Sequence, residues 1–150
     1  MNRRTPLGSL AEFRYQIRRF LDFSRRAARG AGLAPQQHQM LLVIAAGGAG
    51  RDPSIRGLSQ RLFVNHNTAV ELANRLERKG LARRLRHPTD RRRVAVRITP
   101  RGRRIIARLT RHHLAELRTE GPELIRALRG VMRGAQRVAA SRRRTRPHRR

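Results

Sequence analysis

The chain has 150 residues, enough for one domain or compact subunit, and carries 37 lysines and arginines against 9 acidic residues, a formal charge of +28. It has no cysteine, which excludes disulfides, thiolate catalysis and thiol-based sensing. No apolar run approaches the ~20 residues that span a bilayer, and the first residues lack a secretory signal, so a cytoplasmic, nucleoid-associated protein is expected. The charge implies a polyanionic partner, and we expect nucleic acid rather than membrane because no tryptophan is present to anchor an interfacial helix.

The first third of the chain predicts two helices after a disordered stretch over residues 1–8. Apolar residues recur at helical spacing with arginines opposite over 9–29, and glycines follow. A second helix over about 35–46 is apolar almost all round, which predicts a buried position. Its cap is poor, because Ala34 offers no side-chain acceptor.

Residues 54–80 predict a helix, a short turn and a second helix. Ser54 and Asn65 are the expected N-caps, since each places a side-chain oxygen before the open N–H groups of a helix. The second helix is predicted to end at Gly80, which favours the left-handed conformation that terminates helices. Apolar stripes repeat every four residues, at Leu58 and Leu62 in the first helix and at Thr68, Leu72 and Leu76 in the second.

A β-hairpin is predicted next, with strands over 81–86 and 93–98. The second strand alternates polar and apolar residues, and its tip over 87–92 contains Pro88 and Asp90, which favour turns.

Beyond the hairpin, Thr99 followed by Pro100 predicts the start of a helix running to about Thr119. Gly121-Pro122 is expected to interrupt it before a last helix over 123–140. Residues 141–150 predict a disordered basic tail.

The segment 58–104 resembles the DNA-binding half of the multiple antibiotic resistance regulator (MarR) family of bacterial transcription factors. The resemblance implies a mainly α fold with a small β-hairpin wing. It places a winged helix-turn-helix at about 54–99 and dimerisation helices at about 9–29 and 100–140, in one domain over 9–140. Its landmarks are Leu58-Ser59, Leu62, Thr68, the run 75–81, Pro88, Asp90-Arg91-Arg92 and the run 98–102.

The start of the second helix is the expected major-groove reader, because a helix N-terminus with short polar side chains fits that groove. Two alternatives stay open: Asn65 only caps, and Thr68 only packs. Glu71 either accepts from cytosine or is merely solvated. The expected contacts in this helix are Asn65, His66, Asn67 and Thr68, with Arg75 further along the exposed face able to reach either phosphate or guanine.

The hairpin is the expected wing. Arg91, Arg92 and Arg93 at its tip suit a narrow minor groove, where negative potential is concentrated. The resemblance implies that Asp90 holds one of these guanidinium groups in place; the alternative is a solvated turn residue. Phosphate contacts are expected from three arginines at the wing base, Arg83, Arg84 and Arg86.

The resemblance also implies a small phenolic or anionic effector, bound between the dimer helices and the DNA-binding part. For Phe13 and Ile17, packing in the core is the alternative role. His112 and Glu116, four apart on one helix, suit a metal or simple surface packing, and we predict no metal and no cofactor. The candidate effector residues are Phe13, Arg14, Tyr15, Ile17 and His38.

These features predict a homodimeric, sequence-specific regulator of transcription that binds double-stranded DNA. The expected form is a repressor on a pseudo-palindromic operator, released by an effector of unknown identity. One alternative is a nucleoid-type protein that coats DNA without sequence preference. RNA binding is disfavoured because stacking aromatics are scarce. No nucleophile, base and orienting group occur in a catalytic motif, so an enzyme is not expected.

Overall fold

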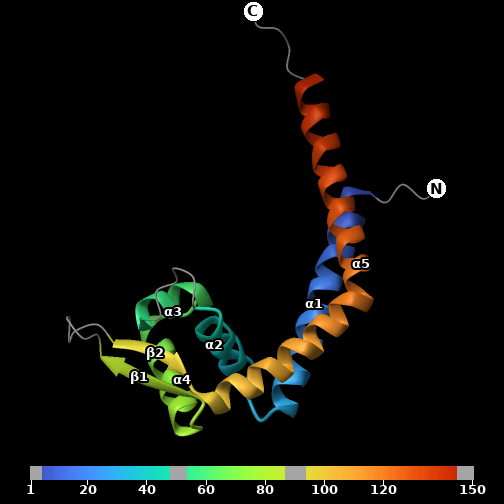
Figure 1. Ribbon diagram of the computed structural model, residues 1–150. Helices are drawn as coiled ribbons and strands as arrows, with labels where there is room; N and C mark the ends of the chain where they lie inside the picture. The colour runs from blue at the N-terminus through green and yellow to red at the C-terminus, as the bar shows by residue number, and fades with distance from the viewer. Residues whose placement is uncertain (1–4, 48–53, 87–93, 145–150) are drawn as a thin grey trace, which may run out of the picture. The chain divides into compact units, whose positions relative to one another are not determined.

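The computed structural model describes residues 5–47, 54–86 and 94–144, and side chains as far as residue 140 (Figure 1). In chain order the elements are α1 (Pro6–Gly30), α2 (Pro35–Ala45), α3 (Ile55–Leu62), α4 (His66–Arg78), β1 (Ala82–Arg86), β2 (Val94–Ile98) and α5 (Pro100–Arg144). This mainly helical architecture with one antiparallel hairpin confirms the predicted fold class.

The chain divides into two compact units where a single domain was predicted. The central unit comprises Ser24–His112, and the terminal unit comprises the described residues up to Phe23 and from His113 onward. In the terminal unit α1 and α5 run antiparallel, because Gly134 approaches Pro6, Gly130 approaches Ser9, and Glu120 pairs with Arg19. No helix among the described residues combines the length and the apolar character needed to cross a bilayer.

The core of the central unit is built around α2, as its apolar sequence predicts. The helix buries Met40, Leu41 and Ile44. Ala34 makes no side-chain cap, and Gln37 compensates by accepting from the Ala34 N–H at 3.0 Å. The rest of this core comes from the other helices, the hairpin and the turns between elements, with Ala28, Leu33, Leu58, Ala69, Leu72, Ala73, Leu76, Leu81, Ala82, Val96, Ile106 and Leu109.

The two-stranded hairpin pairs Ala82 with Ile98 and Arg86 with Val94. It joins α4 through Gly80, whose φ of +66° is the left-handed conformation predicted there. It joins α5 through Thr99, whose hydroxyl accepts from the Gly102 N–H at 3.1 Å and donates to the Gly80 carbonyl at 2.7 Å. The Thr-Pro helix start is therefore confirmed, and the same hydroxyl fastens the beginning of α5 to the end of α4.

Helix α1 begins at Pro6, so the prediction of disorder over 1–8 is wrong for residues 6–8. Thr5 is the physical reason, because its hydroxyl accepts from the Gly8 N–H at 3.1 Å while Pro6 needs no donor at the first helical position. This Thr-Pro pair repeats the one at Thr99-Pro100. Residues 1–4 lie outside the described ranges.

Helix α5 continues through Pro122, so the predicted interruption at Gly121-Pro122 is wrong. An internal proline costs about 3 kcal/mol through a lost hydrogen bond and a clash. The terminal unit offsets this cost through contacts with α1 on both sides of the proline: Glu120 pairs with Arg19, and Gly130 lies against Ser9.

The same helix reaches Arg144, so residues 141–144 are helical rather than part of a disordered tail. Residues 135–144 contain no glycine or proline and are mostly alanine and arginine, which have high helix propensity, so the backbone continues as helix. Residues 145–150 lie outside the described ranges.

Candidate nucleic-acid interface

The N-terminus of α4 is capped by Asn65, as predicted, and is exposed. The Asn65 side chain accepts from the Thr68 N–H at 2.7 Å and caps the helix. His66 and Asn67 are exposed and Thr68 is half-buried. The amide NH₂ of Asn65 is a donor separate from the capping oxygen, so the capping role and a DNA contact are compatible in one side chain.

The two long faces of α4 differ sharply in character. One face is buried through Ala69, Leu72, Ala73 and Leu76. On the exposed face Glu71 accepts from Arg75 Nε at 2.9 Å and lies 3.4 Å from Arg78 Nη2. The hydrogen bond from Arg75, with further attraction from both guanidinium groups, lowers the pKa of Glu71 from its usual value. Glu71 is therefore a bridged carboxylate rather than a merely solvated one.

Arg84 does not take the phosphate-facing position expected for it. Its guanidinium is half-buried and donates to Asn74 Oδ1 at 2.7 Å, to the Val70 carbonyl at 3.4 Å and, over a short contact, to Glu77. Its backbone N–H donates to Glu77 Oε1 at 2.7 Å. Strand alternation explains this placement, because Arg84 shares a face with buried Ala82 and pairs with buried Val96. Arg84 thus ties β1 to α4.

The opposite face of the hairpin is basic. Arg83 pairs in register with Arg97, and both side chains are exposed. Arg86 lies on the same side of β1 as Arg84 by alternation, but it is exposed because it stands at the end of the strand. Arg97 was missed as a candidate, although its alternation with Val96 and Ile98 marks it as outward-facing. Like charges opposite one another destabilise a hairpin unless an anion neutralises them, which makes this pair a candidate phosphate contact.

The predicted wing tip, Asp90, Arg91, Arg92 and Arg93, lies outside the described residues.

A sequence comparison finds a protein of Thauera aromatica that is named for transcriptional regulation of the hcr operon. The two sequences are 34% identical over 123 residues, which cover 81% of this chain and 71% of the relative. The chain belongs to the MarR family. The model of that family, a family of transcriptional regulators, matches residues 31–93, which include α2, α3, α4 and β1.

Solved MarR-family structures share the fold. A MarR-family protein from Bacillus stearothermophilus superposes with a TM-score of 0.70 at 23% identity, covering 93% of this chain and 99% of its own. A variant of MepR from S. aureus bound to an oligodeoxyribonucleotide superposes with a TM-score of 0.64 at 19% identity, covering 83% of this chain and 94% of its own. CouR from Rhodococcus jostii RHA1 bound to p-coumaroyl-CoA superposes with a TM-score of 0.58 at 24% identity, covering 66% of this chain and 68% of its own.

The turn between α3 and α4 of this MarR-family protein contains a residue with unusual backbone geometry that was not among the predicted candidates. Phe63 ends α3 with φ +54° and ψ +42°, and its side chain is 96% exposed. Left-handed backbone is unfavourable for a side chain with a Cβ, and the exposed ring gains little burial in return. No sequence signal marks it, because glycine or asparagine is the residue expected at such a position.

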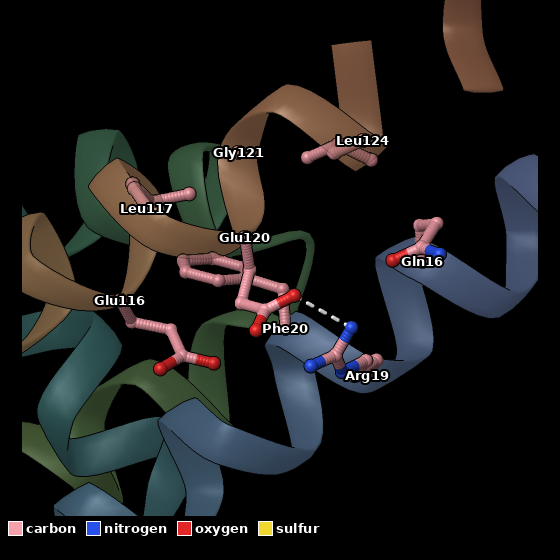
Figure 2. A pocket seen from close by; sticks show the side chains of 8 residues that line it. All are labelled: Gln16, Arg19, Phe20, Glu116, Leu117, Glu120, Gly121 and Leu124. Carbon is pink, nitrogen blue, oxygen red and sulfur yellow. Dashed lines mark ion pairs between the residues drawn. The ribbon is translucent and has the colours of Figure 1, made fainter. Parts of the chain in front are cut away.

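The terminal unit contains a small open hollow between α1 and α5 (Figure 2). An ion pair of 2.7 Å between Arg19 Nη1 and Glu120 Oε2 crosses it, and this bond raises the pKa of Arg19 above its usual value. None of the residues predicted for the effector lines this hollow. Its lining is Gln16, Arg19, Phe20, Glu116, Leu117, Glu120, Gly121 and Leu124.

The predicted effector residues are divided between the two units. Phe13 and Ile17 are half-buried and Arg14 and Tyr15 exposed on α1 in the terminal unit, while His38 is buried on α2 in the central unit.

The histidines of α5 differ in environment. The ring of His113 meets Phe20 and Phe23 edge-on, at centroid distances of 6.0 and 5.4 Å, whereas His112 is exposed. Among the described residues no group of three or more histidines, cysteines or carboxylates is placed to hold a metal ion.

Proposed function

We propose that this MarR-family regulator is a homodimeric repressor that binds a pseudo-palindromic operator and is released by a small-molecule effector. The observation that carries the proposal lies within the central unit, where the exposed, capped start of α4 and the basic face of the hairpin belong to one body. Arg84 connects the two through its bonds to α4. A helix that fits the major groove and a hairpin that contacts the backbone are the two parts of winged-helix recognition of DNA.

In the central unit the proposed base contacts are Asn65, His66, Asn67, Thr68 and Arg75. Arg83, Arg86 and Arg97 are the proposed phosphate contacts, with Arg84 in a supporting role. At the wing tip, the sequence supports minor-groove contacts by Arg91, Arg92 and Arg93 with Asp90 orienting one of them. The oligodeoxyribonucleotide bound to the MepR variant supports duplex DNA as the ligand.

The apolar surface of the terminal unit supports a homodimer. Large exposed apolar side chains in such number usually mark an association surface, because each loses contact with water when a second copy covers it. A two-fold dimer would present two copies of α4 to half-sites about one helical turn apart. The exposed side chains are Leu7, Leu10, Tyr15, Leu21, Leu114, Leu117, Ile125, Leu128, Met132 and Val138.

A small effector is proposed because CouR, a structural neighbour, is bound to p-coumaroyl-CoA. We retain Phe13, Arg14, Tyr15, Ile17 and His38 as candidate contacts with an effector of phenolic or anionic character. Isothermal titration with simple aromatic acids, followed by release of bound DNA, tests this part of the proposal.

The deciding experiment is fluorescence anisotropy with DNA from immediately upstream of the protein's own gene against a shuffled duplex, at about 150 mM salt. A specific regulator is expected to prefer the native duplex by about a thousandfold or more. Equal affinity for the two duplexes would point either to an operator elsewhere in the genome or to the coating protein. Arg92→Ala is expected to weaken specific binding more than Arg142→Ala, and sedimentation equilibrium measures the dimer.

A further inference from the structure

The exposed face of α4 carries a carboxylate where the proposed function requires approach to a polyanion. Glu71 lies two residues from Ala69 and one from Leu72 along the helix, so its side chain points away from the buried stripe. A lone carboxylate here would be repelled by phosphates and would weaken binding. Its neighbours Arg75 and Arg78 neutralise this carboxylate. The geometry of the Glu71–Arg75 hydrogen bond suggests what Glu71 does.

Glu71 engages one particular edge of Arg75. The bond of 2.9 Å joins Glu71 Oε1 to Arg75 Nε, at the inner part of the guanidinium. The two Nη groups at the outer end are not used in this bond, and the Arg75 side chain is 52% exposed. The bond restrains a flexible side chain at its inner edge and leaves the paired outer donors available.

We propose that Glu71 is a positioning residue that presents the Nη donors of Arg75 to the O6 and N7 acceptors of a guanine in the major groove. This inference rests on the proposed sequence-specific binding of DNA. Guanine offers two acceptors on one edge, which match two parallel N–H donors of arginine. Glu71 also disfavours the competing contact of Arg75 with phosphate, because its negative charge weakens the non-directional attraction while leaving directional hydrogen bonds available. The carboxylate therefore raises specificity rather than affinity.

Selection of binding sites from a randomised duplex pool tests this role with the wild-type protein, Glu71→Gln and Arg75→Ala. The wild type is expected to select a G·C pair at one fixed position of each half-site, with about 5- to 150-fold discrimination, the range for a good bidentate contact. Both variants are expected to lose the preference at that same position. Glu71→Gln is also expected to bind random-sequence DNA at least as tightly as the wild type, because it removes a negative charge.

Two outcomes overturn the inference while leaving the proposed function intact. One is a Glu71→Gln protein that keeps the G·C preference, which would show that Arg75 needs no positioning. The other is an Arg75→Ala protein that keeps it, which would show that Glu71 itself accepts from cytosine. A wild-type protein that selects no sequence overturns both this inference and the proposed function.

A matched variant controls for the general effect of removing a carboxylate from a helical ion pair. Glu123 accepts from Arg126 three residues later on α5, in the terminal unit. Glu123→Gln is expected to leave the selected sequence unchanged. Circular dichroism melting verifies that Glu71→Gln and Arg75→Ala remain folded, as expected for exposed side chains.

Discussion

Glu77 accepts from Arg84 twice, at Oε1 from the backbone N–H and at Oε2 from the guanidinium. The first bond gives the backbone N–H of Arg84 an acceptor on α4. The second pairs the positive charge of Arg84, on β1, with the negative charge of Glu77, on α4. Both side chains are less than a third exposed, so the pair is only partly screened by water. Within the central unit, this relationship sets the direction of the hairpin against the helix proposed to enter the major groove.

Arg84→Ala is expected to destabilise the central unit by about 1.5–3 kcal/mol, because charged hydrogen bonds to α4 are lost and Glu77 keeps an unpaired charge. Urea unfolding measures this loss. The neighbouring variant Arg83→Ala, on the exposed face, is expected to change stability by less than about 0.5 kcal/mol. It should instead reduce the slope of log affinity against log salt for DNA by about 0.9. Equal stability losses in the two variants would contradict the assignment.

Asn65 allows its capping role to be separated from contact with DNA. Asn65→Ala is expected to lower the free energy of unfolding by about 1 kcal/mol, because the Thr68 N–H loses its acceptor. Asn65→Asp keeps an acceptor and should retain stability. Its added negative charge is expected to weaken DNA binding by about tenfold or more, or ~1.4 kcal/mol. Anisotropy titrations at matched salt give the second value, and unchanged affinity would place Asn65 outside the interface.

Phe63→Gly is expected to stabilise the protein by about 0.5–1 kcal/mol, since relief of left-handed strain exceeds the entropy cost of glycine. Little burial is lost, because the ring is almost wholly exposed. The corresponding change at the end of α2, Ala46→Gly, is the control, as Ala46 has an ordinary φ of −77°. That variant should be destabilised. Thermal melts that rank the two variants the other way would refute the account of strain.

Gly102→Ala is expected to destabilise the protein by about 1–3 kcal/mol through overpacking. An added Cβ would overlap the Leu81 carbonyl and lie 2.9 Å from Ile98 Cγ1, where α5 begins against the hairpin. At Gly30 an added Cβ meets nothing within 4 Å, so Gly30→Ala should leave stability unchanged or raise it by up to about 1 kcal/mol. Differential scanning calorimetry of both variants checks the contrast.

The ion pairs on α4 predict the acid behaviour of Glu71. Because its pKa is lowered in the folded protein, its contribution to stability is present above the pKa of the unfolded chain. That contribution is lost as pH falls through the lower folded value. Side-chain NMR titration should find the pKa of Glu71 below the ordinary 4.5, and Arg75→Ala should raise it towards that value. An unchanged pKa in the variant would show that the ion pair does not persist in solution.

The local sequence determined most of the element boundaries in the central unit. Ser54 caps α3 by accepting from Gly57, Asn65 caps α4, and Thr99 caps α5, each through a bond to a residue three positions along the chain. Such bonds need no distant partner, which is why residue type and spacing sufficed to predict them. The hairpin followed for the same reason, since its strands are close neighbours in sequence.

Tertiary structure decided what depends on contacts between distant segments. Pro122 does not end α5, because contacts with α1 on both sides offset its local cost. Packing also decided which arginine at the base of the wing is structural. Arg84 faces Glu77 and Asn74 on α4. Arg83 and Arg97 face outward. The composition of the chain does not distinguish a structural arginine from one that binds DNA. Only the placement of acidic and amide partners on another element distinguishes a cation that holds the fold together from one that remains available to DNA.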